Sequence, residues 1–322
     1  MNTCLNEVVL LSNNYQIWNL DEVVKFLVDH QNEHISIDLQ NEGFCLSSVG
    51  FYDLLDNFSF KSVTIDTNNL LEHSEKYNIN ITKPFICFKT EYFERYADVS
   101  YWNKKYKFGC FYNRPLWHRI GLAAEMQTDY SDSCLLNVRC DNKDEDNRKL
   151  FEVDRLFTYS LDSFNKFSKV VSTWPIQVEE TDGYTMNNNT NGHTDQLLKW
   201  YPDFLIDLVC ETWTVGRTFL LSEKTVRPML LKKPMIVMGP RCTLEYLRQM
   251  GFETFSDFWS EDYDGYSEKD RYLKILELIK DLDQLPIEEL DHMYQKMQPI
   301  LEHNLNLLKT QSYKKHITYI ED

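Results

Sequence analysis

A carboxylate and an ammonium group stand side by side at Glu223 and Lys224, directly after Ser222. Ser222 is a good N-cap residue, so both side chains would project from the first turn of a helix. In open α/β sheets ligands bind at the carboxyl ends of strands, and a helix N-terminus favours phosphate. Glu223 can accept hydrogen bonds from sugar or ribose hydroxyls, while Lys224 offers charge to phosphate oxygens. The pattern predicts a site for a ligand with both groups; a solvated, capped helix start is the alternative.

The second half of the chain contains the elements that must position these side chains. In order, we expect a strand at 108–112, a helix through Arg119 to about 126, a strand at 134–138, a loop-rich stretch at 141–200, a strand at 204–210 ending at Glu211, the helix after Ser222, a strand at 234–239, a helix at 242–250 and a short strand at 252–255. Strands that alternate with helices of this length predict a largely parallel sheet.

The first half repeats this alternation. We expect strands at 7–12, 34–39, 62–66 and 84–88, a helix that begins near residue 19 and another within 47–58. The fold class predicted from both halves is therefore α/β. With only ten glycines, no GxGxxG or P-loop pattern follows any of these strands, which argues against a classical dinucleotide fold and against a P-loop kinase.

The domain organisation follows from these patterns. We expect an α/β domain at 1–107, a second α/β domain at 108–266, and helices at 267–322. Ser267 and Asp270 have the spacing of a capping box. A second helix is expected from about Pro286, with Pro299 inside it.

The net charge of −16 and the isoelectric point near 5.0 disfavour nucleic acid as a partner. A local basic patch remains possible in an acidic chain. Its candidate members are Lys104, Lys105, Lys107, Arg114, Lys232 and Lys233.

Cysteine and histidine spacing predicts no metal site. None of the eight cysteines forms a CxxC pair and no HExxH occurs, so we expect reduced core cysteines and no metal. The longest apolar runs contain a charge and fall short of a membrane span, and the N-terminus lacks the basic segment of a signal peptide. We therefore expect no membrane span and a cytoplasmic location.

The block from Glu211-Thr-Trp through Phe219-Leu-Leu-Ser-Glu-Lys-Thr-Val-Arg-Pro to Pro234-Met-Ile-Val-Met-Gly resembles the donor half of a GT-B glycosyltransferase. It is most similar to the fucosyltransferase-like group, which also occurs in bacteria, phages and large viruses. The resemblance covers about residues 108 to 260. An Asn- and Lys-rich composition with few Gly and Ala agrees with an AT-rich genome, such as that of a phage.

The resemblance implies a role for each matching residue. Glu223 would contact the sugar or ribose of the donor, Lys224 its diphosphate, and Glu211 would lie in the same pocket. Arg119 resembles the arginine that holds the leaving diphosphate; a surface helix arginine is the alternative. Arg227 has no firm counterpart in the family and is included because it lies one turn from Glu223.

The resemblance also implies a reaction. Two Rossmann-like domains would face a cleft, with the C-terminal helices packing back across them. A sugar would pass from a nucleotide diphosphate sugar to an acceptor hydroxyl without metal or cofactor. Glu42 is the candidate base, with a solvated loop glutamate as the alternative. The acceptor stays open between a glycan, a protein side chain and a hydroxymethylated base of phage-type DNA. A non-catalytic α/β binding protein of the same fold is the contrasting hypothesis.

Overall fold

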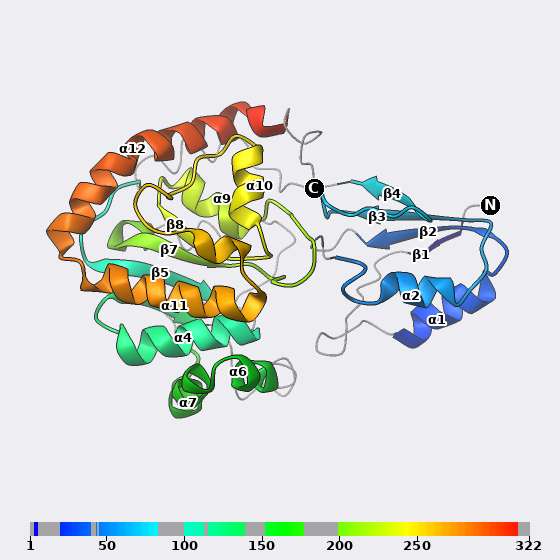
Figure 1. Cartoon of the computed structure of the whole chain (residues 1–322), viewed down its shortest axis with the longest axis horizontal. Coiled ribbons are helices and arrows are strands. Elements are labelled where there is room, and N and C mark those ends of the chain that lie inside the picture. The colour runs from blue at the N-terminus through cyan, green and yellow to red at the C-terminus, as the bar shows by residue number, and fades with distance from the viewer. Residues whose placement is uncertain are drawn as a thin grey trace. The chain divides into compact units, whose positions relative to one another are not determined.

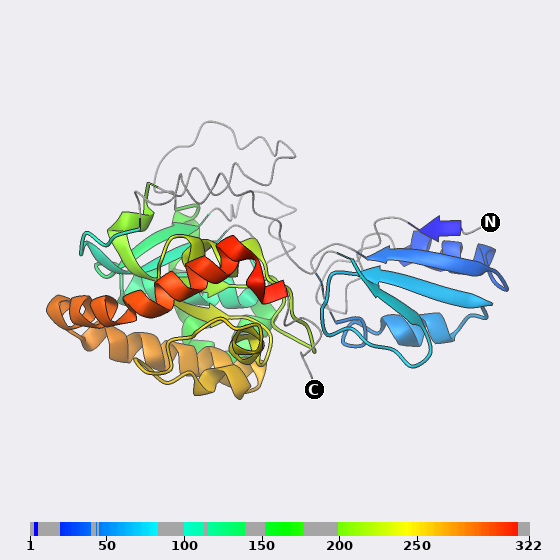
Figure 2. The ribbon, with the colours of Figure 1, turned by 90° about the horizontal axis from the view of Figure 1, so that it is seen from above.

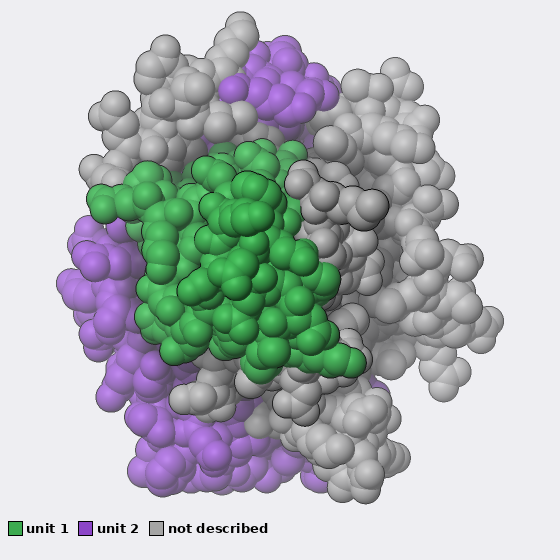
Figure 3. Space-filling view, turned by 90° about the vertical axis from the view of Figure 1, so that its right-hand side faces the viewer, with its two compact units in different colours: residues 1–87, 212–222 green, residues 88–211, 223–322 purple. Residues whose placement is uncertain are grey.

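The computed structural model describes residues 3–5, 20–39, 43, 45–82, 100–112, 115–138, 152–176 and 199–314. The chain divides into two compact units, which Figure 3 colours separately. Unit 1 comprises Met1–Cys87 and Thr212–Ser222, and unit 2 comprises Phe88–Glu211 and Glu223–Asp322. We expected a boundary after residue 107; the compact units divide after residue 87, and residues 212–222, called segment 212–222 below, belong to unit 1.

In its described residues, unit 1 is a parallel sheet with two helices. Its elements are β1 (Thr3–Leu5), α1 (Leu20–Asp29), β2 (His34–Leu39), α2 (Phe51–Asp56), β3 (Ser62–Thr67) and β4 (Asn78–Ile81). The strand order is β1-β2-β3-β4, with every neighbouring pair parallel. Figure 1 shows α1 and α2 on the same face of this sheet. The expected strands at 34–39 and 62–66 are confirmed, whereas those at 7–12 and 84–88 lie outside the described residues.

Strand register aligns the apolar side chains of unit 1 on the face that the helices cover. Ile35 pairs with Val63 and Ile37 with Ile65, so alternate residues of β2 and β3 point to one side. They pack in one cluster with apolar residues of α1 and α2. Trp213, from segment 212–222, belongs to the same cluster. The core of unit 1 therefore includes a side chain from far along the chain.

Unit 2 is a second parallel sheet, covered on both faces. Its main elements are β5 (Tyr106–Tyr112), α4 (Trp117–Asp129), β6 (Cys134–Val138), α6 (Val153–Tyr159), α7 (Leu161–Val170), β7 (Phe204–Cys210), α9 (Glu223–Leu230), β8 (Met235–Met238), α10 (Thr243–Gln249), α11 (Glu268–Gln284) and α12 (Ile287–Thr310). The strand order is β6-β5-β7-β8, all parallel. Figures 1 and 2 show α9 and α12 over one face and α4 and α11 over the other. Every residue of β7 is buried, as expected for a strand covered on both sides. The α/β class is confirmed.

Two expectations for unit 2 are wrong. Residues 153–170, expected within a loop-rich stretch, form α6 and α7, and the Ser160 side chain accepts a hydrogen bond from the Ser163 backbone N–H at the start of α7. Residues 252–255 form no strand. Asn304 of α12 replaces a neighbouring strand there, because its Oδ1 accepts from the Glu253 N–H and its Nδ2 donates to the Glu253 carbonyl, both at 2.8 Å.

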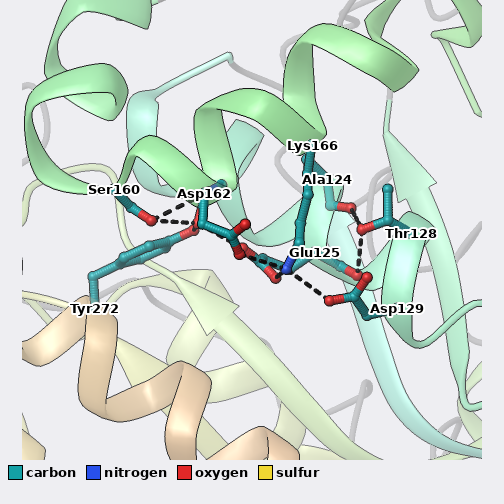
Figure 4. A network of polar contacts seen from close by, with 9 residues as sticks. Ala124, Glu125, Thr128, Asp129, Ser160, Asp162, Lys166 and Tyr272 are labelled. Atoms are coloured by element: carbon teal, nitrogen blue, oxygen red, sulfur yellow. Dashed lines mark hydrogen bonds and ion pairs between the residues drawn. The ribbon is translucent and has the colours of Figure 1, made fainter.

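A polar network joins α4, α7 and α11 (Figure 4); it is buried at Glu125, Ser163 and Tyr272 and exposed at Asp129 and Asp162. Lys166 Nζ lies 2.5 Å from Glu125, 2.7 Å from Asp129 and 2.8 Å from Asp162. Glu125 also accepts a hydrogen bond of 2.6 Å from the Ser163 hydroxyl, to which the Tyr272 hydroxyl donates at 3.0 Å. Buried charges need such partners, since an unpaired one is costly. The network fixes α4, whose first turn enters the candidate site below.

Lys233 is buried at the opposite edge of the sheet, where β7 begins. Its side chain is 1% exposed, and Nζ donates to the carbonyls of Tyr101 at 2.6 Å and Phe204 at 2.9 Å. Burial lowers the pKa of Lys233 to about 7, and the negative charge of Asp207 offsets this lowering only in part. The expectation that Lys233 forms part of a basic surface is therefore wrong.

Lys233 makes the stability of unit 2 depend on pH. The unfolded chain keeps this proton up to the ordinary pKa of 10.5, whereas the folded chain releases it near pH 7. The unfolded state binds more protons between these values, so stability rises with pH. We expect this group to add about 1 to 2 kcal/mol to the free energy of unfolding between about pH 7 and 8.5, measured by urea denaturation. The gain should be absent in Lys233→Met, and equal pH slopes in the two proteins would contradict the assignment.

Gly109 of β5 allows the Phe204 ring of β7 to lie close to the β5 backbone. A Cβ added to it would lie 2.6 Å from ring carbons of Phe204, whereas a Cβ added to Gly265 would meet nothing within 4 Å. We expect Gly109→Ala to lower the free energy of unfolding by about 1 to 3 kcal/mol, since overpacking displaces the ring. The matched control, Gly265→Ala, should stay within about 0.5 kcal/mol. Equal urea midpoints for the two variants would show that the ring moves without cost.

Candidate functional site

The order of strands in unit 2 creates a switch point between β5 and β7. The chain passes from β5 to β6 on one side of β5 and later returns to β7 on its other side. At such a point the connections after the two strands diverge, and ligands bind outside the carboxyl ends of the strands. Glu211 directly follows β7, and α4 begins five residues after the end of β5. The described strands of unit 1 run in consecutive order and have no comparable point.

Glu211 is fixed at this edge by main-chain and side-chain hydrogen bonds. Its backbone N–H donates to the Met238 carbonyl at 2.9 Å, which extends the pairing of β7 with β8. Its carboxylate accepts a hydrogen bond of 2.6 Å from the Thr225 hydroxyl on α9. The second carboxylate oxygen lies 4.0 Å from Lys224 Nζ. Glu211 is 8% exposed, so its carboxylate is held rather than solvated.

Glu223 and Lys224 form the accessible part of the site. Lys224 Nζ lies 2.8 Å from Glu223 Oε1, and the side chains are 22% and 43% exposed for Lys224 and Glu223. Partial burial alone would raise the pKa of the Glu223 carboxyl, but attraction to Lys224 and the hydrogen bond from it lower that pKa overall. Glu223 is therefore ionised at neutral pH. The structure places an ammonium group between two carboxylates, at the first turn of α9.

Arg119 and His118 support the same edge from α4. Arg119 is 3% exposed, and its guanidinium donates to the Cys210 carbonyl at 2.9 Å. The alternative of a surface arginine is therefore wrong. The fully buried His118 ring makes a hydrogen bond of 2.8 Å from Nε2 to the Glu211 carbonyl. Burial, with the nearby Arg119 charge, lowers the pKa of His118 well below its ordinary value. Because a carbonyl only accepts, neutral His118 must carry its proton on Nε2.

The N-terminus of α4 already has an acidic cap. The Trp117 backbone N–H donates to the Glu152 carboxylate at 3.0 Å, and Arg155 lies 3.9 Å from the same carboxylate. Arg155 also bonds the Glu268 carboxylate. An anionic ligand at this edge would therefore meet α9 rather than the first N–H of α4.

Of the other predicted residues, Arg227 makes its described hydrogen bond outside this group, although its charge helps to lower the pKa of Glu223. Arg227 donates from Nε to the Tyr201 hydroxyl, and its guanidinium lies over the Phe111 ring at 5.8 Å. The Tyr201 hydroxyl in turn donates to Asp207 at 2.6 Å. Ser222 is buried in segment 212–222 of unit 1. Glu42 lies outside the described residues.

Sequence reasoning missed His118 and Thr225, the two side chains that hold Glu211. His118 precedes Arg119, and Thr225 follows Lys224, so both are adjacent to residues chosen from the sequence. Neither has a spacing that signals a hydrogen bond to Glu211. Their roles depend on the way α4 and α9 meet the end of β7.

The described residues contain no group of three or more His, Cys, Asp or Glu side chains placed to hold a metal ion. In the same part of the chain, no helix combines the length and apolar character that crossing a membrane requires. Comparisons with protein-family models, curated proteins and solved structures find no match for this chain.

The buried hydrogen bond from His118 to Glu211 should contribute more to the free energy of unfolding than a solvated one. His303 makes a bond of the same kind and the same 2.8 Å length to the Gly251 carbonyl, but at an exposed position. We expect His118→Leu to lower the free energy of unfolding by about 1 to 3 kcal/mol, because the Glu211 carbonyl is left buried without this donor. His303→Leu should cost under about 0.5 kcal/mol. Similar urea denaturation curves for both variants would contradict this assignment.

Proposed function

We propose that this chain is a glycosyltransferase that binds a nucleotide diphosphate sugar at the carboxyl edge of the unit 2 sheet. The observation that carries the proposal is the convergence of Glu211, Glu223 and Lys224 at the switch point. These three residues belong to the sequence block that resembles the donor half of a GT-B enzyme. In this proposal unit 2 is the donor domain and unit 1 the acceptor domain of a GT-B arrangement.

The donor would be held by complementary chemistry. Lys224 carries the positive charge for the diphosphate, and it lies in the first turn of α9, where the helix dipole favours an anion. Glu223, ionised and partly exposed, accepts hydrogen bonds from ribose or sugar hydroxyls. Glu211 is more deeply buried and keeps Lys224 and Thr225 in place. Arg119 adds positive charge beneath the same edge and fixes the end of β7.

In the transfer, the bond between the anomeric carbon and the diphosphate oxygen breaks as the acceptor oxygen bonds to that carbon. Negative charge grows on the departing diphosphate, where Lys224 and Arg119 stabilise it. A carboxylate takes the proton from the acceptor hydroxyl, and Glu42 is the candidate for this base. The acceptor is a hydroxyl of a glycan, a protein side chain or a modified DNA base. No cofactor is assigned.

A thermal-shift panel tests the donor site. We expect one of GDP, UDP, ADP, CDP and dTDP to raise the melting temperature, with or without Mg²⁺. A ligand at about 100 times its dissociation constant stabilises by about 2.7 kcal/mol. The shift should disappear in Lys224→Ala, because the phosphate loses its counter-charge. It should persist in Lys274→Ala, which removes a surface lysine paired with Glu277 at 2.6 Å.

No shift with any of the five nucleotides would contradict the transferase proposal and favour a non-catalytic binding protein. If a nucleotide binds, Glu223→Gln separates the two classes. An enzyme should lose turnover in this variant while it keeps its melting temperature.

A further inference from the structure

Asn69 has a buried side chain whose hydrogen-bonding capacity is completely used. It is 0% exposed. Its Oδ1 accepts from the N–H groups of Leu71 at 3.1 Å and Phe219 at 2.9 Å. Its Nδ2 donates to the Glu72 carboxylate at 3.1 Å and to the Arg217 carbonyl at 3.0 Å. Two partners can only donate and two can only accept, so the orientation of the amide is determined.

Two of these four bonds hold segment 212–222, about 150 positions away in the chain. The segment makes further bonds beside them, since the Leu70 N–H donates to the Phe219 carbonyl at 3.0 Å and the Thr218 hydroxyl donates to the Gly43 carbonyl. Within the segment, Gly216 has a φ of 74°, and a Cβ added there would lie 2.6 Å from that of Cys45. Segment 212–222 is therefore fitted closely into unit 1.

Both ends of this segment lead directly into the candidate site. Glu211 precedes its first residue, and Glu223 follows its last. Phe219, which Asn69 holds, lies four positions before Glu223. We propose that Asn69 is a positioning residue for the site: by fixing segment 212–222, it orders the backbone from which α9 begins and so the first turn that carries Glu223 and Lys224. The consequence for donor binding rests on the proposed function above.

The physical argument is that a short, immobilised connection limits the freedom of the helical turn attached to it. Three residues link Phe219 to Glu223, and two of them, Leu221 and Ser222, are buried. Asn69→Ala leaves the buried Phe219 N–H and the partly buried Arg217 carbonyl without this partner, which favours opening of the segment. The start of α9 then loses the fixed backbone on its N-terminal side. A ligand that needs ordered Glu223 and Lys224 must restore that order when it binds.

Hydrogen exchange of the full, ligand-free chain tests this inference without reference to any donor. We expect amides of α9, Glu223–Leu230, to exchange about five to ten times faster in Asn69→Ala than in the wild type. Amides of β8, Met235–Met238, should not change. The matched control is Tyr52→Phe, which removes a 2.7 Å bond to the same Glu72 carboxylate but none to segment 212–222. Equal exchange of α9 in the two variants would overturn the inference.

Thr218→Val provides a second variant, in which only a hydroxyl is replaced and Asn69 is retained. We expect it to accelerate exchange of α9 in the same direction by a smaller factor, and it decides the question if Asn69→Ala does not fold. Unchanged α9 exchange in a folded Thr218→Val protein would then overturn the inference.

Calorimetric titration with the nucleotide that raises the melting temperature in the thermal-shift panel adds the functional arm. Asn69→Ala should bind the active nucleotide about five to ten times more weakly, and Tyr52→Phe should bind it as the wild type does. If none of the five nucleotides binds the wild type, the proposed donor site fails while the exchange experiment still decides the role of Asn69.

Discussion

The end of β7 is the point on which the candidate site depends. The Cys210 carbonyl accepts from Arg119, the Glu211 N–H donates to Met238, and the Glu211 carbonyl accepts from His118. Strand β8 and helix α4 therefore hold two successive peptide groups in one place. Beyond Glu211 the chain enters unit 1, and it returns to unit 2 at Glu223. The backbone of the site is thus restrained at the end of β7 and within the segment that separates its acidic residues.

In both units, buried polar side chains hold the backbone that leads into the site. His118, Arg119 and Asn69 are each almost completely inaccessible to solvent. A buried polar group is tolerated when it is hydrogen-bonded, and these three use that requirement to fix backbone carbonyls and N–H groups. Lys224 and Glu223 differ because their side chains keep partial exposure. The buried set positions the backbone, and the exposed pair remains available to a ligand.

Local sequence patterns predicted most of the described strands of the two sheets, but few of the hydrogen bonds between residues that are distant in the chain. Strands such as β2 and β7 have alternating or continuous apolar residues, which are visible in any short window of sequence. Helix α7 was missed because its mixed, polar composition resembles a loop, and its burial depends on α4 and α11. The run at 252–255 has the composition of a strand, yet its backbone pairs with the side chain of Asn304.

In the candidate site, too, local sequence patterns revealed some residues, while those that depend on long-range contacts were missed. Glu211, Glu223 and Lys224 were identified because they are near in sequence and because their segment resembles a family pattern. Arg227 was chosen for its helical spacing; its charge helps to lower the pKa of Glu223, while its described hydrogen bond is to Tyr201. The spacing of residues could not reveal Asn69, since its partners lie about 150 positions away and the interaction forms only when segment 212–222 packs into unit 1.

The central claim is that the carboxyl edge of unit 2 binds a nucleotide diphosphate sugar. Native mass spectrometry of the full chain with an equimolar mixture of nucleotide sugars tests it most directly, because the added mass identifies the ligand. We predict one predominant bound species, displaced by its own nucleoside diphosphate and absent in Lys224→Ala. No bound nucleotide sugar, or binding that Lys224→Ala leaves unchanged, would contradict the claim.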